Sequence, residues 1–119
     1  MKYAAIDIGS NAIRLLIQES VIVSKSDVYF KKISLTRVPI RLGKDVFTNG
    51  EVSNENLINL IDSFNAFKLL MKVNGVAKFR ACATSAMREA INSKEVCQKI
   101  FKSTGIDLEV IPGSEEAKL

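Results

Sequence analysis

Apolar and polar residues alternate along the first third of the chain, which is the period of a β-strand that buries one face. The alternation predicts strands over residues 3–8, 12–19 and 28–35, and the short polar links between them indicate antiparallel neighbours. Residues 38–42 should be extended, because Pro39 disfavours a helical conformation at the residue before it. We expect residues 43–50 to form a loop.

From Ser53 onward the apolar residues recur at spacings of three and four, which places them on one face of a helix. Ser53 is a suitable N-cap for this helix, and Asn74-Gly75 ends it with a signal for positive φ. Residues 76–83 are rich in apolar residues again and predict the next strand.

The last third of the chain predicts two helices and a strand. Thr84-Ser85 should cap a short helix, and Asn92-Ser93 should start a longer one that stops at Thr104-Gly105. Residues 107–111 predict a strand. After Pro112 the pattern favours a further helix, which has completed only one turn when the sequence ends.

The expected order is therefore β-β-β-α-β-α-β-α. Strands separated by helices should be parallel and joined by right-handed crossovers, whereas the first three should form an antiparallel meander. The predicted fold class is α/β with one mixed sheet. Because the last helix is cut short, we expect residues 1–119 to be one domain of a longer protein, truncated in that helix.

Composition narrows the class of protein. The chain has 119 residues, of which 47% are apolar and 25% charged, as expected for one globular domain. Charged or amide residues interrupt every apolar run, so no membrane partner is expected, and the N-terminus does not resemble a secretory signal. We expect a cytoplasmic protein.

Charge and side-chain chemistry exclude several kinds of site. The chain has no histidine, so any proton transfer must use carboxylates. Cys82 and Cys97 do not form a Cys-x-x-Cys pair, which disfavours zinc. The net charge of +4 favours anionic partners, but the basic residues are scattered and Lys31-Lys32 is the only adjacent basic pair, which disfavours nucleic acid.

The polar link Gly9-Ser10-Asn11 between the first two strands is the first candidate site. Glycine and asparagine tolerate the positive φ of a tight turn, and the N–H groups that follow Gly9 could cradle a phosphate. Asp7, acidic beside a phosphate, then requires a cation, and Mg²⁺ held through water is the best choice. An ordinary hairpin explains the same residues.

Two further candidates lie near the ends of predicted strands. Arg88 follows a parallel strand at its carboxyl end, where α/β sheets bind ligands, although spacing alone favours a solvated helix arginine. Glu115 and Glu116 begin the last helix, where acidic side chains complement the helix dipole. A carboxylate there could equally position a water molecule.

Four segments together resemble the exopolyphosphatase/guanosine pentaphosphate phosphohydrolase (Ppx/GppA) family. They are Ala5-Ile6-Asp7-Ile8-Gly9-Ser10-Asn11, Pro39-Ile40-Arg41-Leu42-Gly43, Ala83-Thr84-Ser85-Ala86-Met87-Arg88-Glu89-Ala90 and Ile111-Pro112-Gly113-Ser114-Glu115-Glu116-Ala117. The resemblance implies the N-terminal lobe of a two-lobed, ribonuclease H-like or actin-like ATPase fold, similar to that of sugar kinases and acetate kinase. The second lobe, with its Gly-rich phosphate loop, is absent from this sequence.

The resemblance also implies an activity and its residues. The reaction would be Mg²⁺-dependent hydrolysis of inorganic polyphosphate or guanosine pentaphosphate, with Glu116 placing the attacking water and Asp7 holding the metal. Gly9, Ser10, Asn11 and Arg88 would bind phosphate. The partners would be the substrate and the second lobe, without which this chain should be inactive, and a homodimer is left open.

Two residues depart from the family's pattern, and two other functions compete with it. The family often has serine where this chain has Ala12, and the difference removes a hydroxyl near the expected site. It often has Ser-Gly where this chain has Pro112-Gly113, and proline lacks the backbone N–H that the serine would supply. The alternatives are a sugar or acetate kinase-like phosphotransferase lobe and a non-catalytic actin-like assembly module. The segments around Arg88 and Glu116 favour the hydrolases.

Overall fold

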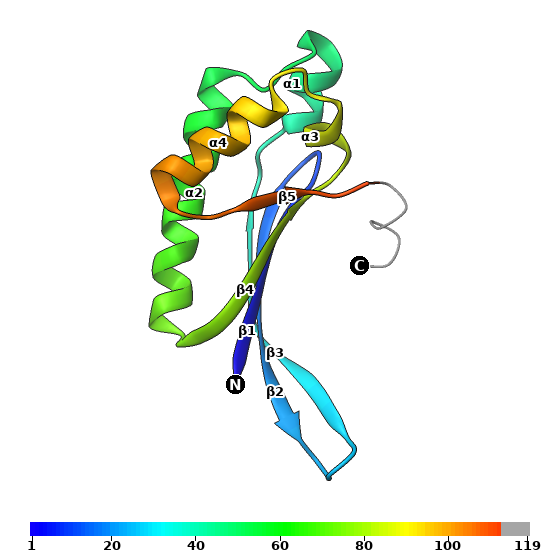
Figure 1. Ribbon diagram of the computed structural model, residues 1–119, viewed down its shortest axis with the longest axis vertical. Coiled ribbons are helices and arrows are strands. Elements are labelled where there is room, and N and C mark those ends of the chain that lie inside the picture. Colours follow the sequence, from blue (N-terminus) through cyan, green and yellow to red (C-terminus); the bar gives the residue numbers. More distant parts are fainter. Residues whose placement is uncertain (113–119) are drawn as a thin grey trace.

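The computed structural model describes residues 1–112 and contains five strands and four helices in that range (Figure 1). In chain order they are β1 (Lys2–Ile8), β2 (Ile13–Ile22), β3 (Val28–Val38), α1 (Leu42–Asn49), α2 (Asn54–Val73), β4 (Val76–Ala83), α3 (Ser85–Glu89), α4 (Ser93–Thr104) and β5 (Leu108–Val110). The predicted helix after Pro112 lies outside the described residues.

The strands form a single mixed sheet, as predicted. Their order is β3-β2-β1-β4-β5. The β1–β2 and β2–β3 pairs are antiparallel, whereas β4 is parallel to β1 and β5 is parallel to β4. Ile8, the last residue of β1, pairs with Ala83, the last residue of β4. The residues that follow these two strands therefore leave the same edge of the sheet side by side.

One face of the sheet is covered by helices α2 and α4, and the core lies between these two layers (Figure 1). Alternate residues of β1, among them Ile6 and Ile8, point into this core, where Phe64 and Phe67 of α2 are fully buried. Asp7 lies between Ile6 and Ile8 in the sequence, so its side chain lies on the opposite face of the sheet. No helix within residues 1–112 covers that opposite face.

Helix α1 is the main error of the sequence prediction, which placed a loop over residues 43–50. Leu42 and Val46 lie one turn apart and are both buried, which stabilises a two-turn helix. Gly50 ends it in the left-handed conformation, with φ of +80° and its N–H donating to Val46 O. Leu42 and Val46 alone are too few apolar residues to reveal a helical period, so pattern does not indicate this helix.

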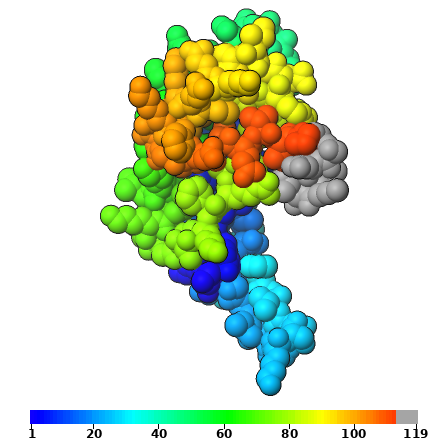
Figure 2. All heavy atoms as spheres, viewed as in Figure 1, coloured from blue at the N-terminus to red at the C-terminus, as the bar shows by residue number. Residues whose placement is uncertain are grey.

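The β2–β3 hairpin is longer than predicted. Both strands run beyond the part of the sheet that α2 and α4 cover, and their far ends project from the body of the molecule (Figure 2). Ile22, Val28 and Tyr29 are more than half exposed there. Phe30 meets Tyr3 edge to face, with ring centroids 5.9 Å apart.

Three residues are predicted to cap helices, and two of them use their side chains to bond other segments. Ser53 caps α2 as expected, accepting from Asn56 N–H at 3.2 Å. Thr84 stands at the N-cap of α3, but its hydroxyl donates to Ile8 O. The Asn92 side chain bonds both N–H and C=O of Val52 instead of capping α4. These polar groups join separate segments, which local sequence cannot reveal.

Candidate functional site

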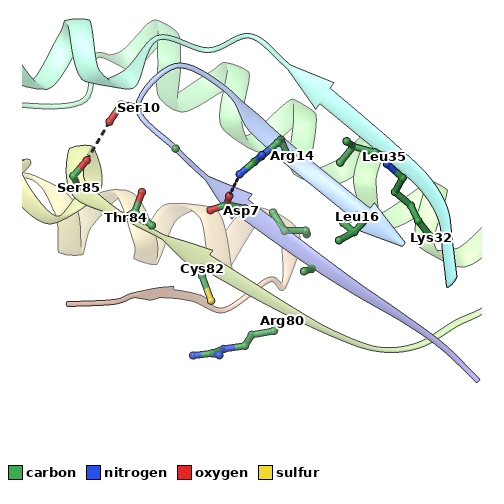
Figure 3. Close-up of a pocket in the computed structure, with 13 residues that line it drawn as sticks. Asp7, Ser10, Arg14, Leu16, Lys32, Leu35, Arg80, Cys82, Thr84 and Ser85 are labelled. Carbon is green, nitrogen blue, oxygen red and sulfur yellow. Dashed lines mark hydrogen bonds and ion pairs between the residues drawn. The ribbon is translucent and has the colours of Figure 1, made fainter. Parts of the chain in front are cut away.

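The turn between β1 and β2 meets the first residues of α3 at the carboxyl edge of the sheet. Thr84 donates to Ile8 O from its backbone N–H at 3.2 Å and from its hydroxyl at 3.3 Å, which continues the β1–β4 pairing past both strands. Two residues beyond the end of each strand, Ser10 Oγ and Ser85 Oγ lie 3.2 Å apart (Figure 3). The sheet thus brings two hydroxyl groups together where parallel strands end.

The turn itself has a different geometry from the one predicted. Within residues 1–112, positive φ occurs only at Gly50, Gly75 and Gly105, so neither Gly9 nor Asn11 adopts it. Gly9 N–H donates to Ala12 O at 2.9 Å, and a Cβ on Gly9 would lie 3.3 Å from that same oxygen. Glycine is therefore favoured at position 9 by close approach.

Asp7 lies on the open face of the sheet, opposite its cross-strand partner Arg14. The two side chains form an ion pair (Figure 3). Both remain partly exposed, at 35% for Asp7 and 55% for Arg14. Such a solvated pair contributes little stability, so the Asp7 carboxylate is available for another cation at small cost.

The side chains around Asp7 limit which metal ion could bind there. Within the described part of the chain, no three His, Cys, Asp or Glu residues are grouped closely enough to form a cation cage. Mg²⁺ differs from most metals in this respect, because it commonly keeps several waters and takes one or two carboxylates together with phosphate oxygens. A single carboxylate at this turn fits Mg²⁺ bound together with phosphate oxygens and does not fit zinc.

A pocket of about 840 Å³ occupies the open face beside this turn (Figure 3). It contains three of the predicted site residues, namely Asp7, Gly9 and Ser10. Its lining is Ala5, Ile6, Asp7, Gly9, Ser10, Arg14, Leu16, Lys32, Leu35, Arg80, Cys82, Thr84 and Ser85. Three of these side chains are basic and one is acidic, which favours an anionic ligand.

Asn11 and Arg88 do not line this pocket. Asn11 is exposed at the turn. Arg88 is half-buried, and its Nη1 donates to Ile111 O at 2.9 Å, which ties α3 to the segment that follows β5. Phosphate binding by these two residues stays a prediction. Glu115 and Glu116 lie outside the described residues.

Ser85 lines the pocket although the sequence predicts only a helix cap for it. The information was present in the strand pairing. Once β1 and β4 are parallel with Ile8 opposite Ala83, the residues two positions further on must lie close together. Arg80 lines the pocket from β4 and pairs with Glu109 at 2.9 Å, and its part in the site was equally unforeseen.

The sequence profile of the Ppx/GppA phosphatase family matches residues 21–119. The chain belongs to the Ppx/GppA phosphatase family. The first 20 residues, which contain the turn, also align with family members, since the similarity to exopolyphosphatase 1 of Mycobacterium tuberculosis extends over the whole chain at 29% identity. The aligned part is 33% of that relative.

A relative named for a different activity is similar to this Ppx/GppA chain at a comparable sequence identity. Guanosine-5'-triphosphate,3'-diphosphate pyrophosphatase of Photobacterium profundum is 28% identical over 117 residues, which are 98% of this chain and 22% of the relative. The chain therefore spans a third or less of the length of these curated relatives.

Solved structures confirm the predicted fold. The Aquifex aeolicus Ppx/GppA family member superposes with a TM-score of 0.86 at 28% identity, over 98% of this chain and 36% of that one. An exopolyphosphatase from Cytophaga hutchinsonii gives 0.86 at 29% identity, over 99% of this chain and 36% of that one. Thermus thermophilus RuvC, at 11% identity and 0.52, shares the fold alone. No helix among residues 1–112 is long and apolar enough to cross a bilayer.

Proposed function

We propose that the protein to which this Ppx/GppA chain belongs hydrolyses phosphoanhydride bonds of inorganic polyphosphate or guanosine pentaphosphate and releases terminal phosphate. The observation that carries the proposal is the Ser10–Ser85 hydroxyl pair beside a basic pocket at the carboxyl edge of β1 and β4. The similarity to exopolyphosphatases and to a guanosine-5'-triphosphate,3'-diphosphate pyrophosphatase supports it.

The turn and α3 supply the phosphate contacts in this proposal. Backbone N–H groups of the turn and the hydroxyls of Ser10 and Ser85 donate to phosphate oxygens, and Asn11 adds a side-chain amide. Arg88 contributes a guanidinium, whose planar donors match phosphate oxygens two at a time. These groups hold the transferred phosphoryl in line for attack, which is the main requirement of phosphoryl transfer.

Asp7 would hold Mg²⁺, directly or through a bound water, at the edge of the pocket. The ion supplies neutralisation of the phosphate charge when it is bound. Asp7 exchanges its ion pair with Arg14 for this contact, and the released Arg14 then lies within the pocket lining as a further cation for the substrate.

Glu116 would place the attacking water in this proposal. The sequence predicts a helix after Pro112, and a carboxylate in the first turn of such a helix is favoured in its charged form by the helix dipole. A charged carboxylate orients water well and accepts its proton as the bond forms. Arg88 donates to the carbonyl of Ile111, which lies five residues before Glu116 in the sequence.

The other wall of the site belongs to the remainder of the protein. The chain corresponds to about a third of the exopolyphosphatase relatives, so a second lobe closes the cleft over the pocket in this proposal. One wall cannot fix in-line geometry, and the 119-residue chain by itself should therefore be inactive. A homodimer and a cytoplasmic location remain expectations from the sequence.

The test is an assay of the whole protein for phosphate release from long-chain polyphosphate and from guanosine pentaphosphate, with and without Mg²⁺. Release from either substrate supports the proposal. Transfer of phosphate from ATP to a sugar or to acetate, without hydrolysis of the two substrates, would favour the phosphotransferase. ATP-dependent light scattering without phosphate release from either one would favour the assembly module.

A further inference from the structure

Helix α1 contacts the phosphate-binding turn directly, which nothing in its sequence suggested. Gly43, in the first turn of α1, is buried and donates its backbone N–H to Ser10 O at 2.8 Å. The turn is therefore held by a third segment, in addition to β1 and β2. α1 and α3 both lie beside the end of the β1–β2 hairpin in Figure 1.

The glycine at position 43 is explained by space rather than by backbone conformation. Gly43 is not among the residues with positive φ, so any residue could adopt its backbone angles. A Cβ added there would lie 3.0 Å from Ser10 Cβ and 3.3 Å from Ser10 O, which is closer than side chains normally pack. A residue with a Cβ at this position would therefore push Ser10 by a few tenths of an ångström, whereas glycine does not.

Helix α1 is itself firmly held, so this contact is with a rigid element. One oxygen of Asp45 accepts hydrogen bonds from Ser53 N–H at 3.1 Å, Ser53 Oγ at 2.7 Å and Asn56 Nδ2 at 2.7 Å. These bonds fasten α1 to the start of α2. Beyond the other end of the helix, Gly50 O accepts from Ile91 N–H at 2.9 Å.

Ser10 is consequently located between two fixed points. Its carbonyl is held by Gly43 of α1, and its hydroxyl lies against Ser85 of α3. A displacement of the turn by α1 would move the Ser10 hydroxyl away from Ser85 and redirect the turn amides. Both groups belong to the proposed phosphate contacts.

We propose that Gly43 is a positioning residue, which sets the place of the Ser10 turn so that its donors meet the substrate phosphate. The role rests on the proposed function. If Gly43 has this role, a methyl group added at position 43 impairs the site by pushing on the Cβ of Ser10. A variant that merely destabilised α1 would have the same effect whatever residue stood at position 10.

The test compares Gly43→Ala in the whole protein on three backgrounds at position 10. In the wild-type background, kcat/KM for polyphosphate should fall by about fivefold to twentyfold, less than the ~10²-fold loss that a 1 Å misplacement causes. In a Ser10→Gly background the 3.0 Å contact with the Cβ is gone and only the 3.3 Å approach to the carbonyl oxygen of residue 10 remains, so Gly43→Ala should cost clearly less than in wild type. In a Ser10→Ala background the Cβ remains, so the full loss should persist. Lys44→Ala, an exposed neighbour on α1, should leave activity unchanged.

Thermal unfolding of the same variants gives a readout that does not depend on activity. The unfolding midpoints should be non-additive for Gly43→Ala with Ser10→Gly, and additive with Ser10→Ala. Equal losses of kcat/KM in all three backgrounds would overturn the positioning role. A wild-type protein that hydrolyses neither substrate would overturn the proposed function instead, while the unfolding midpoints would still decide whether Gly43 constrains Ser10.

Discussion

The hydroxyl oxygens of Ser10 and Ser85 lie 3.2 Å apart, although 75 residues separate them in the chain. The contact follows from the parallel pairing of β1 with β4, in which Ile8 is opposite Ala83. Because each serine lies two residues beyond its strand, the strand register also sets their separation. This contact makes Ser85 as strong a candidate for phosphate binding as Ser10.

The first prediction concerns Ser85. Ser85→Ala removes a hydroxyl that can donate to phosphate, and kcat/KM for polyphosphate should fall by about tenfold, the effect of losing roughly 1.5 kcal/mol of hydrogen bonding to a charged group. Ser85→Thr keeps the hydroxyl and should recover part of the loss. Ser103→Ala, on the exposed face of α4, is the matched control. Steady-state kinetics of the whole protein provide the measurement, and unchanged kinetics in Ser85→Ala would remove Ser85 from the site.

The second prediction concerns Arg88. Arg88→Ala should raise KM for polyphosphate, because a charge-assisted contact worth roughly 1.5–3 kcal/mol is lost. Arg88→Lys should recover only part of it, since the planar fork is lost. The bond from Arg88 to Ile111 O means that the same variant should also unfold at a lower temperature. A lower melting temperature with an unchanged KM would leave Arg88 a structural role alone.

The sequence predicted the sheet well because strand periodicity depends on which face is buried, and the core of β1 and β2 follows it closely. The prediction failed where contacts between distant segments determine the local structure. Helix α1 depends on two buried residues, and the side chains of Thr84 and Asn92 bond to backbone far away in the chain. Local pattern singles out Asp7, Gly9 and Ser10, which line the pocket, and their roles stay predictions. Ser85 required the strand register, and Gly43 required knowledge of α1.

The third prediction concerns Asp7. If its carboxylate binds Mg²⁺, Asp7→Asn should raise the Mg²⁺ concentration for half-maximal activity by about 10- to 100-fold, the usual cost of losing an outer-sphere partner. The melting temperature should change little, because the ion pair with Arg14 is solvated. Arg14→Gln breaks the same ion pair but leaves the carboxylate, so it should not raise the Mg²⁺ requirement. A raised requirement in Arg14→Gln as well would point to the ion pair and not to the metal.

The fourth prediction concerns pH and Asp45. Burial acts to raise the pKa of Asp45, but the hydrogen bonds from Ser53 and Asn56 outweigh it and hold the pKa below its ordinary value of 3.8. A lowered folded-state pKa gives stability that is present above the unfolded pKa and is lost as pH falls through the folded one. Asp45→Asn should therefore melt below wild type at neutral pH, and the gap should narrow as pH drops below about 4. A gap independent of pH would mean that the charge of Asp45 does not matter.

The fifth prediction concerns Glu116 and its neighbour. Glu116→Gln preserves shape but cannot accept a proton, so kcat of the whole protein should fall by roughly 10²–10⁴ with little change in substrate affinity, the usual range for a general base. Glu115→Gln is the matched control and should lose far less, since adjacent residues of the helix that the sequence predicts would face different directions. Equal losses in both would favour a shared interaction with the helix dipole. The isolated 119-residue chain should release no phosphate, and turnover by it that Glu116→Gln abolishes would place the catalytic groups within this one lobe.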